Sequence, residues 1–276
     1  MSCRVSCMVF TLDEEVNLPH CLDALTWCDD IIVVDSGSGD RTLEIARKAG
    51  ARLFAHAFAG FGCQRNWALA NTAPKHPWVL ILDADERVSP GLVNEINALL
   101  IDRPDIGAAR LSRKFMMWGK WLRYSSQYPV WVIRLVHRDR VTFENRGHAE
   151  TQHVQGPVAE LRNSLIDENH KGLSQWWQRQ RVYARADALY ELDEEGVSLP
   201  WRDVLSPDPM ARRMFFKRLG WRMPLRDWIY FGYSFLLRLG FLDGAAGWRF
   251  CKMRAQYQRM IMNEKRRLRV RHRQTQ

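Results

Sequence analysis

The sequence predicts an α/β fold with a mostly parallel central sheet flanked by helices, followed by a basic, aromatic and helical C-terminal region. Short β-rich apolar runs alternate with helix-like stretches in the first half, and the runs at residues 31–34 and 78–82 are apolar throughout. Such runs are typical of parallel strands that helices bury on both faces. With 276 residues, 46% of them apolar, the chain suits one large domain with an appendage, or two domains.

The first half is expected to contain these elements in chain order: strand 3–10, helix 19–27, strand 31–34, helix 43–50, strand 51–54, helix 65–70 and strand 78–82. Asp40 or Thr42 could cap the second helix, and Gly50 is typical of its C-terminal end. Ser89 followed by Pro90 predicts a further helix, with Ser89 as the N-cap and Pro90 in the first turn.

Beyond residue 105 the patterns weaken. Strands are expected at residues 106–113 and 130–136, separated by an irregular segment rich in Met, Trp and Tyr. A long helix is expected at residues 172–192. Prolines and aspartates interrupt residues 199–209, where we place the start of the C-terminal region. The expected parts are residues 1–105 and 106–198, as two halves of one domain, and residues 199–276.

The C-terminal region carries the excess positive charge. Residues 201–276 hold 18 Lys and Arg against 5 Asp and Glu, whereas the first 200 residues hold 23 and 26. Basic groups interleaved with aromatic ones fit an anionic lipid surface or a nucleic acid, and ordinary helices completing a core or a subunit interface are the alternative. Residues 228–242 predict a helix that lies flat on a membrane, and the basic run 265–273 could meet acidic phospholipid or remain solvated.

Other classes are disfavoured. The six cysteines form no CxxC pair, which argues against a zinc ribbon and a disulfide framework and suits a reducing cytosol. The first ten residues do not resemble a signal peptide, and no stretch reaches the roughly 18 uncharged apolar residues of a membrane-spanning helix.

Two carboxylates follow the strand at residues 78–82 directly, as Asp83-Ala84-Asp85. They leave the carboxyl edge of the sheet, where open α/β sheets bind ligands. Mg²⁺ commonly binds through one or two carboxylates together with substrate phosphates. The alternative is one aspartate that caps a turn beside a solvated neighbour.

Two further polar loops are expected at the same edge. Asp35 ends the second strand and precedes the small residues 36–39, which permit close approach of a ligand. Its carboxylate could accept a hydrogen bond from a pyrimidine N–H or simply form a turn. The first strand runs into the acidic segment 11–18. If these strands are parallel, three carboxyl-bearing loops meet in one cleft. Neither GxGxxG nor a P-loop motif is present.

These motifs together resemble the family 2 glycosyltransferases with the nucleotide-sugar GT-A fold. The resemblance extends to about residue 190, toward bacterial enzymes that lengthen the lipopolysaccharide core or related envelope glycans. Asp13 stands where the family often has Asn. The matching segments are residues 11–18, 33–42, 64–66 and 82–85.

The resemblance implies a role for each matching residue. Thr11, Glu14 and Asp35 would hold the nucleoside of a UDP-sugar, with Asp35 facing the uracil. Arg65 would approach the nucleotide or its phosphates, with a surface charge as the alternative. Asp83 would contact the ribose or a metal-bound water, or ligate the metal. Asp85 would ligate the Mn²⁺ or Mg²⁺ that bridges the diphosphate.

The acceptor hydroxyl needs a carboxylate within hydrogen-bond reach to take its proton. Relatives often have a His-Glu pair at this point, whereas this chain reads His148-Ala149-Glu150. We favour Glu150 as this base, with His148 and Glu144 as alternatives. A surface ion pair could equally explain any of the three. His170 matches a histidine of the relatives that could touch the metal or the diphosphate. Lys120, within an aromatic segment, could form part of an acceptor wall, although core packing explains the tryptophans equally well.

The implied activity is an inverting, metal-dependent transfer of a hexose, with glucose expected, from a UDP-sugar to a lipopolysaccharide core or another lipid-linked envelope glycan. The protein is expected to be cytoplasmic and peripheral, on the inner face of the bacterial inner membrane, and able to form oligomers through its C-terminal helices, with no nucleic acid partner.

Two alternatives belong to other classes. A protein that binds nucleic acid or a membrane through the basic tail would leave the acidic cleft unexplained, and salt-sensitive DNA binding without UDP affinity would favour it. A phosphohydrolase of the haloacid dehalogenase type would use Asp83 and Asp85. Its motif, however, usually opens the chain and precedes Gly-Thr, not Glu86-Arg87.

Overall fold

The structure is a computed structural model that describes residues 4–146, 149–197 and 199–274. The chain divides into two compact units, Met1–Gly172 and Leu173–Gln276.

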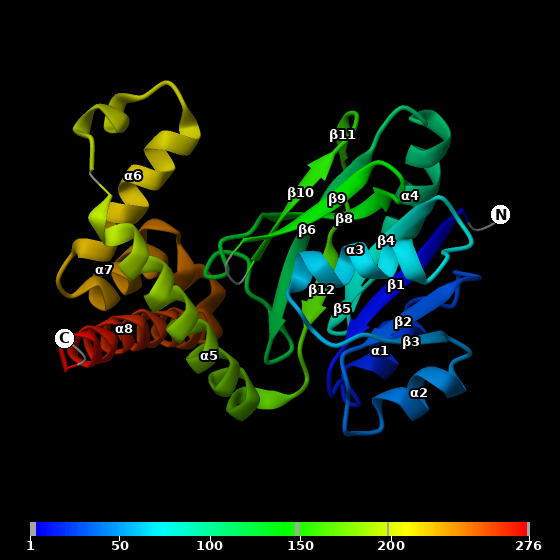
Figure 1. Cartoon of the computed structure of the whole chain (residues 1–276), viewed down its shortest axis with the longest axis horizontal. Helices are drawn as coiled ribbons and strands as arrows, with labels where there is room; N and C mark the ends of the chain where they lie inside the picture. Colours follow the sequence, from blue (N-terminus) through cyan, green and yellow to red (C-terminus); the bar gives the residue numbers. More distant parts are fainter. Residues whose placement is uncertain (1–3, 147–148, 198, 275–276) are drawn as a thin grey trace. The chain divides into compact units, whose positions relative to one another are not determined.

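The first unit is built of strands with helices on both faces (Figure 1). Its helices are α1 (Leu18–Asp23), α2 (Thr42–Lys48), α3 (Phe61–Asn71) and α4 (Pro90–Asp102). The strands are β1 (Val5–Thr11), β2 (Ile31–Asp35), β3 (Arg52–Ala55), β4 (Trp78–Asp83), β5 (Glu86–Arg87), β6 (Ala108–Met117), β7 (Lys120–Trp121), β8 (Val130–His137), β9 (Val141–Arg146), β10 (Ala149–Val154), β11 (Val158–Glu160) and β12 (Leu165–Glu168).

Ten of the described strands form one sheet in the order β3-β2-β1-β4-β8-β6-β12-β5, with β7 and β11 paired to β6. The first four strands of this order are mutually parallel. Strand β8 enters antiparallel to both β4 and β6, and β12 then runs parallel to β6. The predicted α/β class with a mostly parallel sheet is confirmed. Strands β9 and β10 form a separate antiparallel hairpin.

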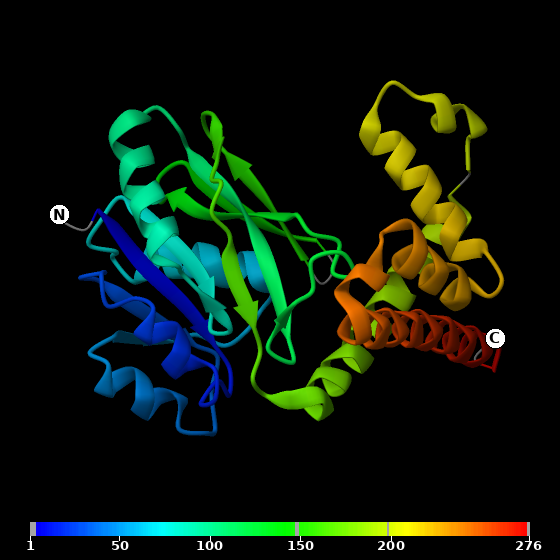
Figure 2. The same cartoon turned by 180° about the vertical axis from the view of Figure 1, so that it is seen from behind.

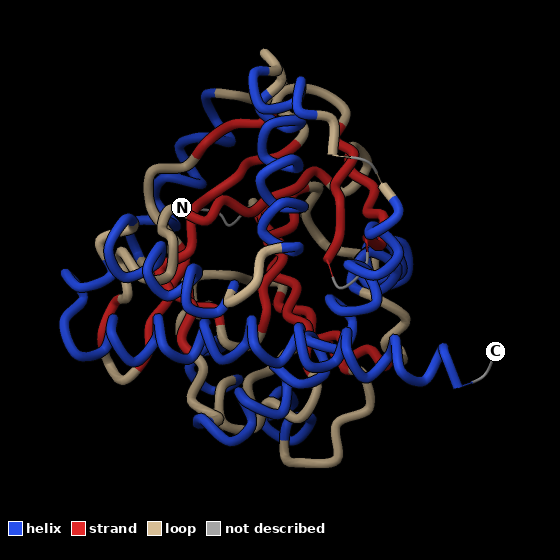
Figure 3. Tube along the Cα trace, turned by 90° about the vertical axis from the view of Figure 1, so that its left-hand side faces the viewer, coloured by secondary structure: helices blue, strands red, loops and turns tan. Residues whose placement is uncertain are grey.

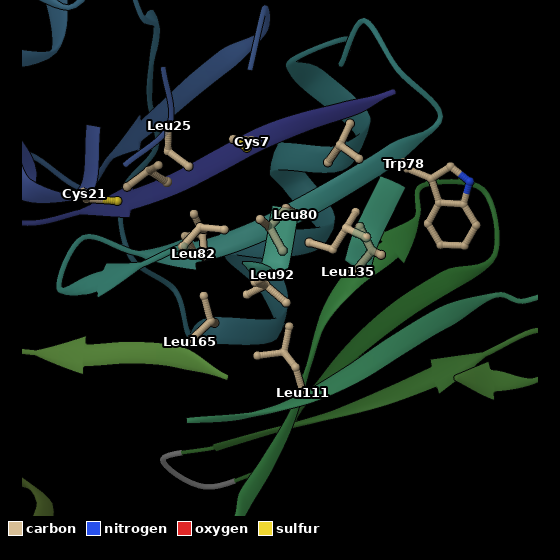
Figure 4. Packing of buried hydrophobic residues seen from close by; sticks show 14 of the residues in the cluster. Cys7, Cys21, Leu25, Trp78, Leu80, Leu82, Leu92, Leu111, Leu135 and Leu165 are labelled. Carbon is tan, nitrogen blue, oxygen red and sulfur yellow. The ribbon is translucent and has the colours of Figure 1, made fainter. Parts of the chain in front are cut away.

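Both faces of the parallel strands are buried, which is why their sequences are apolar throughout. Cys7 and Leu80 face a cluster that α1 and α4 supply, where Figure 4 shows them beside Cys21 and Leu92. Met8 faces the opposite way, into a cluster with α3 and the β9–β10 hairpin. Figures 1 and 2 show the two sides of this sheet.

Of the two predicted helix caps, the one at α4 is confirmed. Ser89 is its N-cap, and the Ser89 Oγ accepts a hydrogen bond from Leu92 N at 3.3 Å. The predicted cap of α2 at Asp40 or Thr42 is wrong, because the N-cap is Arg41 and Thr42 is the first helical residue; its N–H donates to Asp40 Oδ1 at 2.9 Å. Helix α2 ends shortly before Gly50, as predicted. The segment expected to be irregular is partly strand, because β6 continues to Met117 and pairs back on β7.

Every described element of the second unit is a helix (Figure 3). These elements are α5 (Gly172–Asp193), η1 (Glu194–Gly196), η2 (Trp201–Leu205), α6 (Pro209–Arg222), α7 (Arg226–Gly232), η3 (Tyr233–Leu237, a π-helix), η4 (Gly240–Asp243) and α8 (Gly244–Gln274). Helix α5 belongs to this unit because Ala184 and Ala188 pack against Tyr257 and Ile261 of α8. The sequence places the start of the C-terminal region later, within residues 199–209.

The prediction of a single helix at residues 228–242 is wrong, because the chain there divides into α7, η3 and η4. Leu239 has a φ of 60°, and Gly240 and Gly247 come together so closely that a Cβ on Gly247 would lie 2.1 Å from Gly240 O. Only glycine permits this contact, which folds the segment back onto the start of α8.

No helix within the described ranges is long and apolar enough to cross a membrane. Among the described cysteines, Cys21, Cys63 and Cys251 are free thiols.

Candidate active site

Three strand ends meet at one edge of the sheet. In the parallel register, Thr11 of β1 is paired with Asp35 of β2, and the neighbouring Phe10 is paired with Asp83 of β4. The loops that follow β1, β2 and β4 therefore leave the sheet side by side, as the sequence predicts.

The turn after β2 is organised around the Asp35 carboxylate. It accepts hydrogen bonds from Thr11 Oγ1 at 2.8 Å, Gly37 N at 2.9 Å, and both Ser38 N and Ser38 Oγ at 2.8 and 2.5 Å. Burial would raise the pKa of Asp35, but these donors outweigh burial and lower it. A carboxylate offers about four acceptor positions, and all four hydrogen bonds to Asp35 come from the end of β1 and the turn after β2. Asp35 therefore holds these two segments in one arrangement.

Glu14, in the loop after β1, lies among polar partners from three segments. Its carboxylate accepts from Asn17 Nδ2 at 2.7 Å and from Lys171 Nζ at 2.6 Å, and its N–H donates to Thr42 Oγ1 at 2.7 Å. Burial raises the pKa of Glu14 even though Lys171 opposes the rise. Lys171 follows β12, so the end of that strand also reaches this edge.

Asp83 lies between two arginines. Its Oδ2 accepts from Arg134 Nη2 at 2.5 Å, and its Oδ1 lies 3.7 Å from Arg65 Nη2. Burial acts to raise its pKa, but the Arg134 and Arg65 guanidinium groups lower the pKa of Asp83 to about 2. Asp83 is therefore ionised at neutral pH and already neutralised by this chain's own cations.

Asp85 contacts the C-terminal end of β12 and the residue that follows it. Its Oδ2 accepts from Asn169 Nδ2 at 2.8 Å, and its carbonyl oxygen accepts from Glu168 N at 3.0 Å. His170 N donates to Asn17 Oδ1 at 2.7 Å, and the His170 ring packs at 4.7 Å from the ring of His20. Asp85 and His170 are thus both positioned by the strand end that carries Lys171.

Several carboxyl groups lie near Asp85, and one of them, Asp167, pairs with Arg113 at 3.4 Å. Burial and the Asp85 charge raise the pKa of Asp167 to about 8, and burial raises the pKa of Glu86. Such crowding is typical of a site that a cation completes. In the described part of the chain no group of three or more His, Cys, Asp or Glu side chains could hold a metal ion. Asp85 fits a Mg²⁺ or Mn²⁺ that takes its other ligands from phosphates and water.

The β9–β10 hairpin separates the two described base candidates. Glu150 is paired with Asn145, whereas Glu144 is paired with Thr151, so the two glutamates extend from opposite faces of the hairpin. Asn145 Oδ1 accepts from Gly62 N of α3 at 2.8 Å, which places the Glu150 face toward α3.

Glu150 forms an ion pair with Arg65, and its Oε2 is buried without a hydrogen-bond partner among the described residues. Glu144 is bonded to His153 at 3.0 Å, and its side chain is 69% exposed. His148 lies outside the described residues. Glu150 is therefore the described base candidate that the fold connects, through Arg65, to Asp83.

Two remaining predictions concern surface and donor contacts. Lys120 is exposed on β7, paired with Met117 of β6. Arg65, predicted near the donor nucleotide or its phosphates, lies between Asp83 and Glu150. Two residues without a predicted role, Arg134 and Lys171, occupy central positions. Arg134 is a lone charge in the apolar run of β8, and this interruption of the pattern could have indicated a functional residue. Lys171 follows β12, where no local sequence pattern indicates its role.

The sequence profile of Glycosyl transferase family 2 matches residues 6–161 of this chain. The chain belongs to this family. It is therefore a glycosyltransferase, and its α/β fold agrees with the GT-A fold expected for the family. Membership in family 2 selects the transferase over the phosphohydrolase considered for Asp83 and Asp85.

Among curated proteins, the chain is similar to the lipopolysaccharide core biosynthesis glycosyltransferase LpsC of Rhizobium meliloti (strain 1021), with 24% identity over 243 residues, 82% of this chain and 85% of LpsC. It is also similar to an uncharacterized glycosyltransferase of Rickettsia bellii (strain RML369-C), with 33% identity over 94 residues, 34% of this chain and 31% of that protein.

Among solved structures, TarS 1–349 of S. aureus resembles the chain with a TM-score of 0.44 and 14% identity, covering 91% of this chain and 90% of that one. Glucosyl-3-phosphoglycerate synthase from Mycobacterium tuberculosis, in complex with Mg²⁺ and uridine-diphosphate, gives a TM-score of 0.45 and 18% identity, covering 67% and 76%.

Proposed function

We propose that this family 2 glycosyltransferase moves a hexose, with glucose expected, from a UDP-sugar to a lipopolysaccharide core or another lipid-linked envelope glycan, with inversion at the anomeric carbon. The observation that carries the donor assignment is the common edge at which Thr11, Asp35 and Asp83 end three parallel strands. Similarity to LpsC over 82% of the chain supports the acceptor class.

In this proposal residues 1–105 bind the donor and residues 106–198 the acceptor. The loops joined by Asp35 and Glu14 hold the nucleoside, and Lys171 places a cation beside them at 2.6 Å from Glu14. Asp85, with Asp83 and His170 as further candidates, holds Mn²⁺ or Mg²⁺, which would neutralise charge on the departing diphosphate.

The chemical step is a displacement at the anomeric carbon. The acceptor oxygen forms its bond to that carbon while the bond to the diphosphate oxygen breaks. The hydroxyl proton passes to a carboxylate, and we assign this role to Glu150 because its Oε2 is buried and has no partner among the described residues. An ionised carboxylate is required to take the proton, and Glu150 forms an ion pair with the Arg65 guanidinium.

Donor binding is tested by thermal unfolding of the full chain with UDP, with and without Mn²⁺. UDP at about 100 times its dissociation constant should raise Tm by about 5 to 10 °C only when the metal is present. Asp85→Ala should abolish this gain. Asp139→Ala, at an aspartate whose side chain is 70% exposed, is the matched control and should retain it. An equal UDP effect without metal, or an unchanged Asp85→Ala, would remove the metal from the proposal.

We also propose that the second unit docks on an anionic membrane surface, on the inner face of the inner membrane, where a lipid-linked acceptor would lie. Residues 223–248, named here the apolar segment, support this. Their exposed large apolar side chains are Met223, Leu225, Trp228, Ile229, Tyr233, Leu236, Leu237, Leu239, Phe241, Leu242 and Trp248.

The charges of the apolar segment favour lipid over water or an acidic partner. Its two acidic residues, Asp227 and Asp243, are 5% and 3% exposed, and Asp227 is paired with Arg259 at 2.7 Å. With both carboxylates withdrawn from the surface, the exposed side chains of this segment are apolar, and Arg238 is a partly exposed cation among them. That combination attracts acidic headgroups and buries apolar side chains between them.

Flotation with liposomes tests this docking. The full chain should float with phosphatidylglycerol vesicles and much less with phosphatidylcholine vesicles. Leu237→Asp, at a side chain 76% exposed in the apolar segment, should reduce flotation severalfold. Val182→Asp, 68% exposed on α5, is the matched control. Flotation independent of anionic lipid would contradict the proposal, and a dimer that Leu237→Asp dissociates would assign the segment to a subunit interface.

A further inference from the structure

A pocket of about 470 Å³ lies beside Asp83 in the first unit. Four elements line it, supplying Arg65 from α3, Arg110 from β6, Arg134 from β8 and Glu150 from β10. Arg65 and Arg134 both contact Asp83 as well, so the pocket adjoins the first acid of the Asp83-Ala84-Asp85 motif. Its size lies within the range of small-molecule sites.

Arginine is the commonest charged residue in the lining of the pocket. Three guanidinium groups and one carboxylate contribute to it, and the side chains of Arg65 and Arg134 are only 7% and 4% exposed. Carboxylates already accompany both arginines, because Arg134 pairs with Asp83 and Glu86 and Arg65 pairs with Glu150. Burial and the neighbouring Arg134 charge nevertheless lower the pKa of Arg65 to about 10.

Buried polar atoms without partners border this space. Arg134 Nε and Glu150 Oε2 have no hydrogen-bond partner among the described residues. A buried donor or acceptor without a partner costs free energy, and a ligand that supplies the partner recovers it. A guanidinium N–H requires an acceptor, and a carboxylate oxygen requires a donor such as a hydroxyl.

The rim of the pocket adds a surface suited to a sugar ring. Trp131 of β8 is 38% exposed, and the Arg110 guanidinium lies over its ring at 5.3 Å. Arg110 also pairs with Glu160 at 2.7 Å, and its side chain is 51% exposed. An aromatic face next to arginines offers stacking to an apolar sugar face and paired hydrogen bonds to an anion.

We propose that this pocket is an acceptor subsite for an anionic group, a phosphate or a carboxylate, carried by the glycan that receives the sugar. Arg65, Arg134 and Arg110 bind the anion, and the sugar bearing the reacting hydroxyl lies against Trp131 and within reach of Glu150. The inference rests on the proposed transferase function and adds to it the charge class of the acceptor.

Isothermal titration of the full chain tests the subsite, with UDP and Mg²⁺ saturating so that the donor site is filled. The probes are glucose 6-phosphate, glucuronate and glucose. At least one of the two anionic sugars should bind about tenfold more tightly than glucose, since a hydrogen-bonded charge is worth roughly that factor. A preference for the phosphate identifies a phosphorylated acceptor, and a preference for glucuronate identifies a uronic acid.

Variants then locate the binding. Arg110→Gln should remove most of the anionic preference and Arg110→Lys should keep part of it, while the affinity for UDP stays unchanged. Arg103→Gln is the matched control, because Arg103 is 48% exposed and, like Arg110, paired with one surface carboxylate. The inference would be overturned if the three sugars bound equally well, or if none of them bound. It would also be overturned if Arg110→Gln kept the full preference for the anionic sugar. If the unaltered protein did not bind UDP, the proposed function itself would be refuted.

Discussion

Replacing Glu150 with glutamine is expected to lower the rate of sugar transfer by about 10²- to 10⁴-fold, the contribution typical of a general base. Glutamine keeps the size of the side chain and its hydrogen bonds but cannot take the proton of the acceptor hydroxyl. Binding of UDP should be retained, because Glu150 lies on the β9–β10 hairpin and not among the loops that follow β1 and β2. Turnover with an envelope glycan acceptor and UDP affinity should be measured on the same preparation.

Glu144→Gln is the control for that experiment. The two glutamates belong to one hairpin, but Glu144 extends from the opposite face and its side chain is 69% exposed. Transfer by Glu144→Gln should therefore be close to that of the unaltered enzyme. If Glu150→Gln turns over normally, the base lies elsewhere, and His148→Ala would be the next variant to assay.

The largest expected effect on stability lies in the second unit, at Glu191. This α5 carboxylate is 3% exposed and accepts from Arg226 Nη1 and Nη2 at 2.8 and 2.9 Å and from Lys265 Nζ at 3.0 Å. Glu191→Ala leaves Arg226 without its bidentate partner in a buried position. Loss of one partner of a buried pair typically costs about 3 to 5 kcal/mol.

Urea unfolding of the full chain, with hydrogen exchange of α5 and α8 peptides, should show this loss. Exchange should accelerate in both helices because the ion pair joins α7 and α8 to α5. Glu264→Ala is the matched control, since Glu264 pairs with Arg267, which is 74% exposed, and should cost less than about 1 kcal/mol. The double variant Glu191→Ala with Arg226→Met should recover part of the stability. Equal effects of Glu191→Ala and Glu264→Ala would mean that the buried network adds nothing to the fold.

The parallel half of the fold could be predicted from the sequence because its signals are local. The apolar runs ending at Asp35 and Asp83 identify buried strands, and Ser89 with Pro90 identifies the start of α4. If these strands are parallel, their carboxyl ends lie at one edge of the sheet. The sequence therefore predicts that the loops beginning at Asp35 and Asp83 leave the sheet at that same edge.

The antiparallel half carried weaker signals. Strand β12 has only four residues, too few for a clear pattern. In the β9–β10 hairpin, the register that decides which residues are paired cannot be derived from composition. For this reason no sequence pattern indicated a role for Lys171, and Glu144 and His148 stayed as alternatives to the favoured base Glu150. The break of residues 228–242 was likewise hidden, because it depends on the contact between Gly240 and Gly247, which only the folded chain reveals.

The order of residues alone determined the α/β class, the parallel strands and the family to which this transferase belongs, because apolar runs and short motifs are properties of neighbouring residues. Tertiary structure alone decided that Arg134 and Arg65 neutralise Asp83, that Glu150 faces α3 and Arg65, and that Asp227 and Asp243 leave the surface of the second unit. Those outcomes depend on which side chains meet across the sheet and between helices, and electrostatic pairing and burial act only between groups that the fold has already brought into contact.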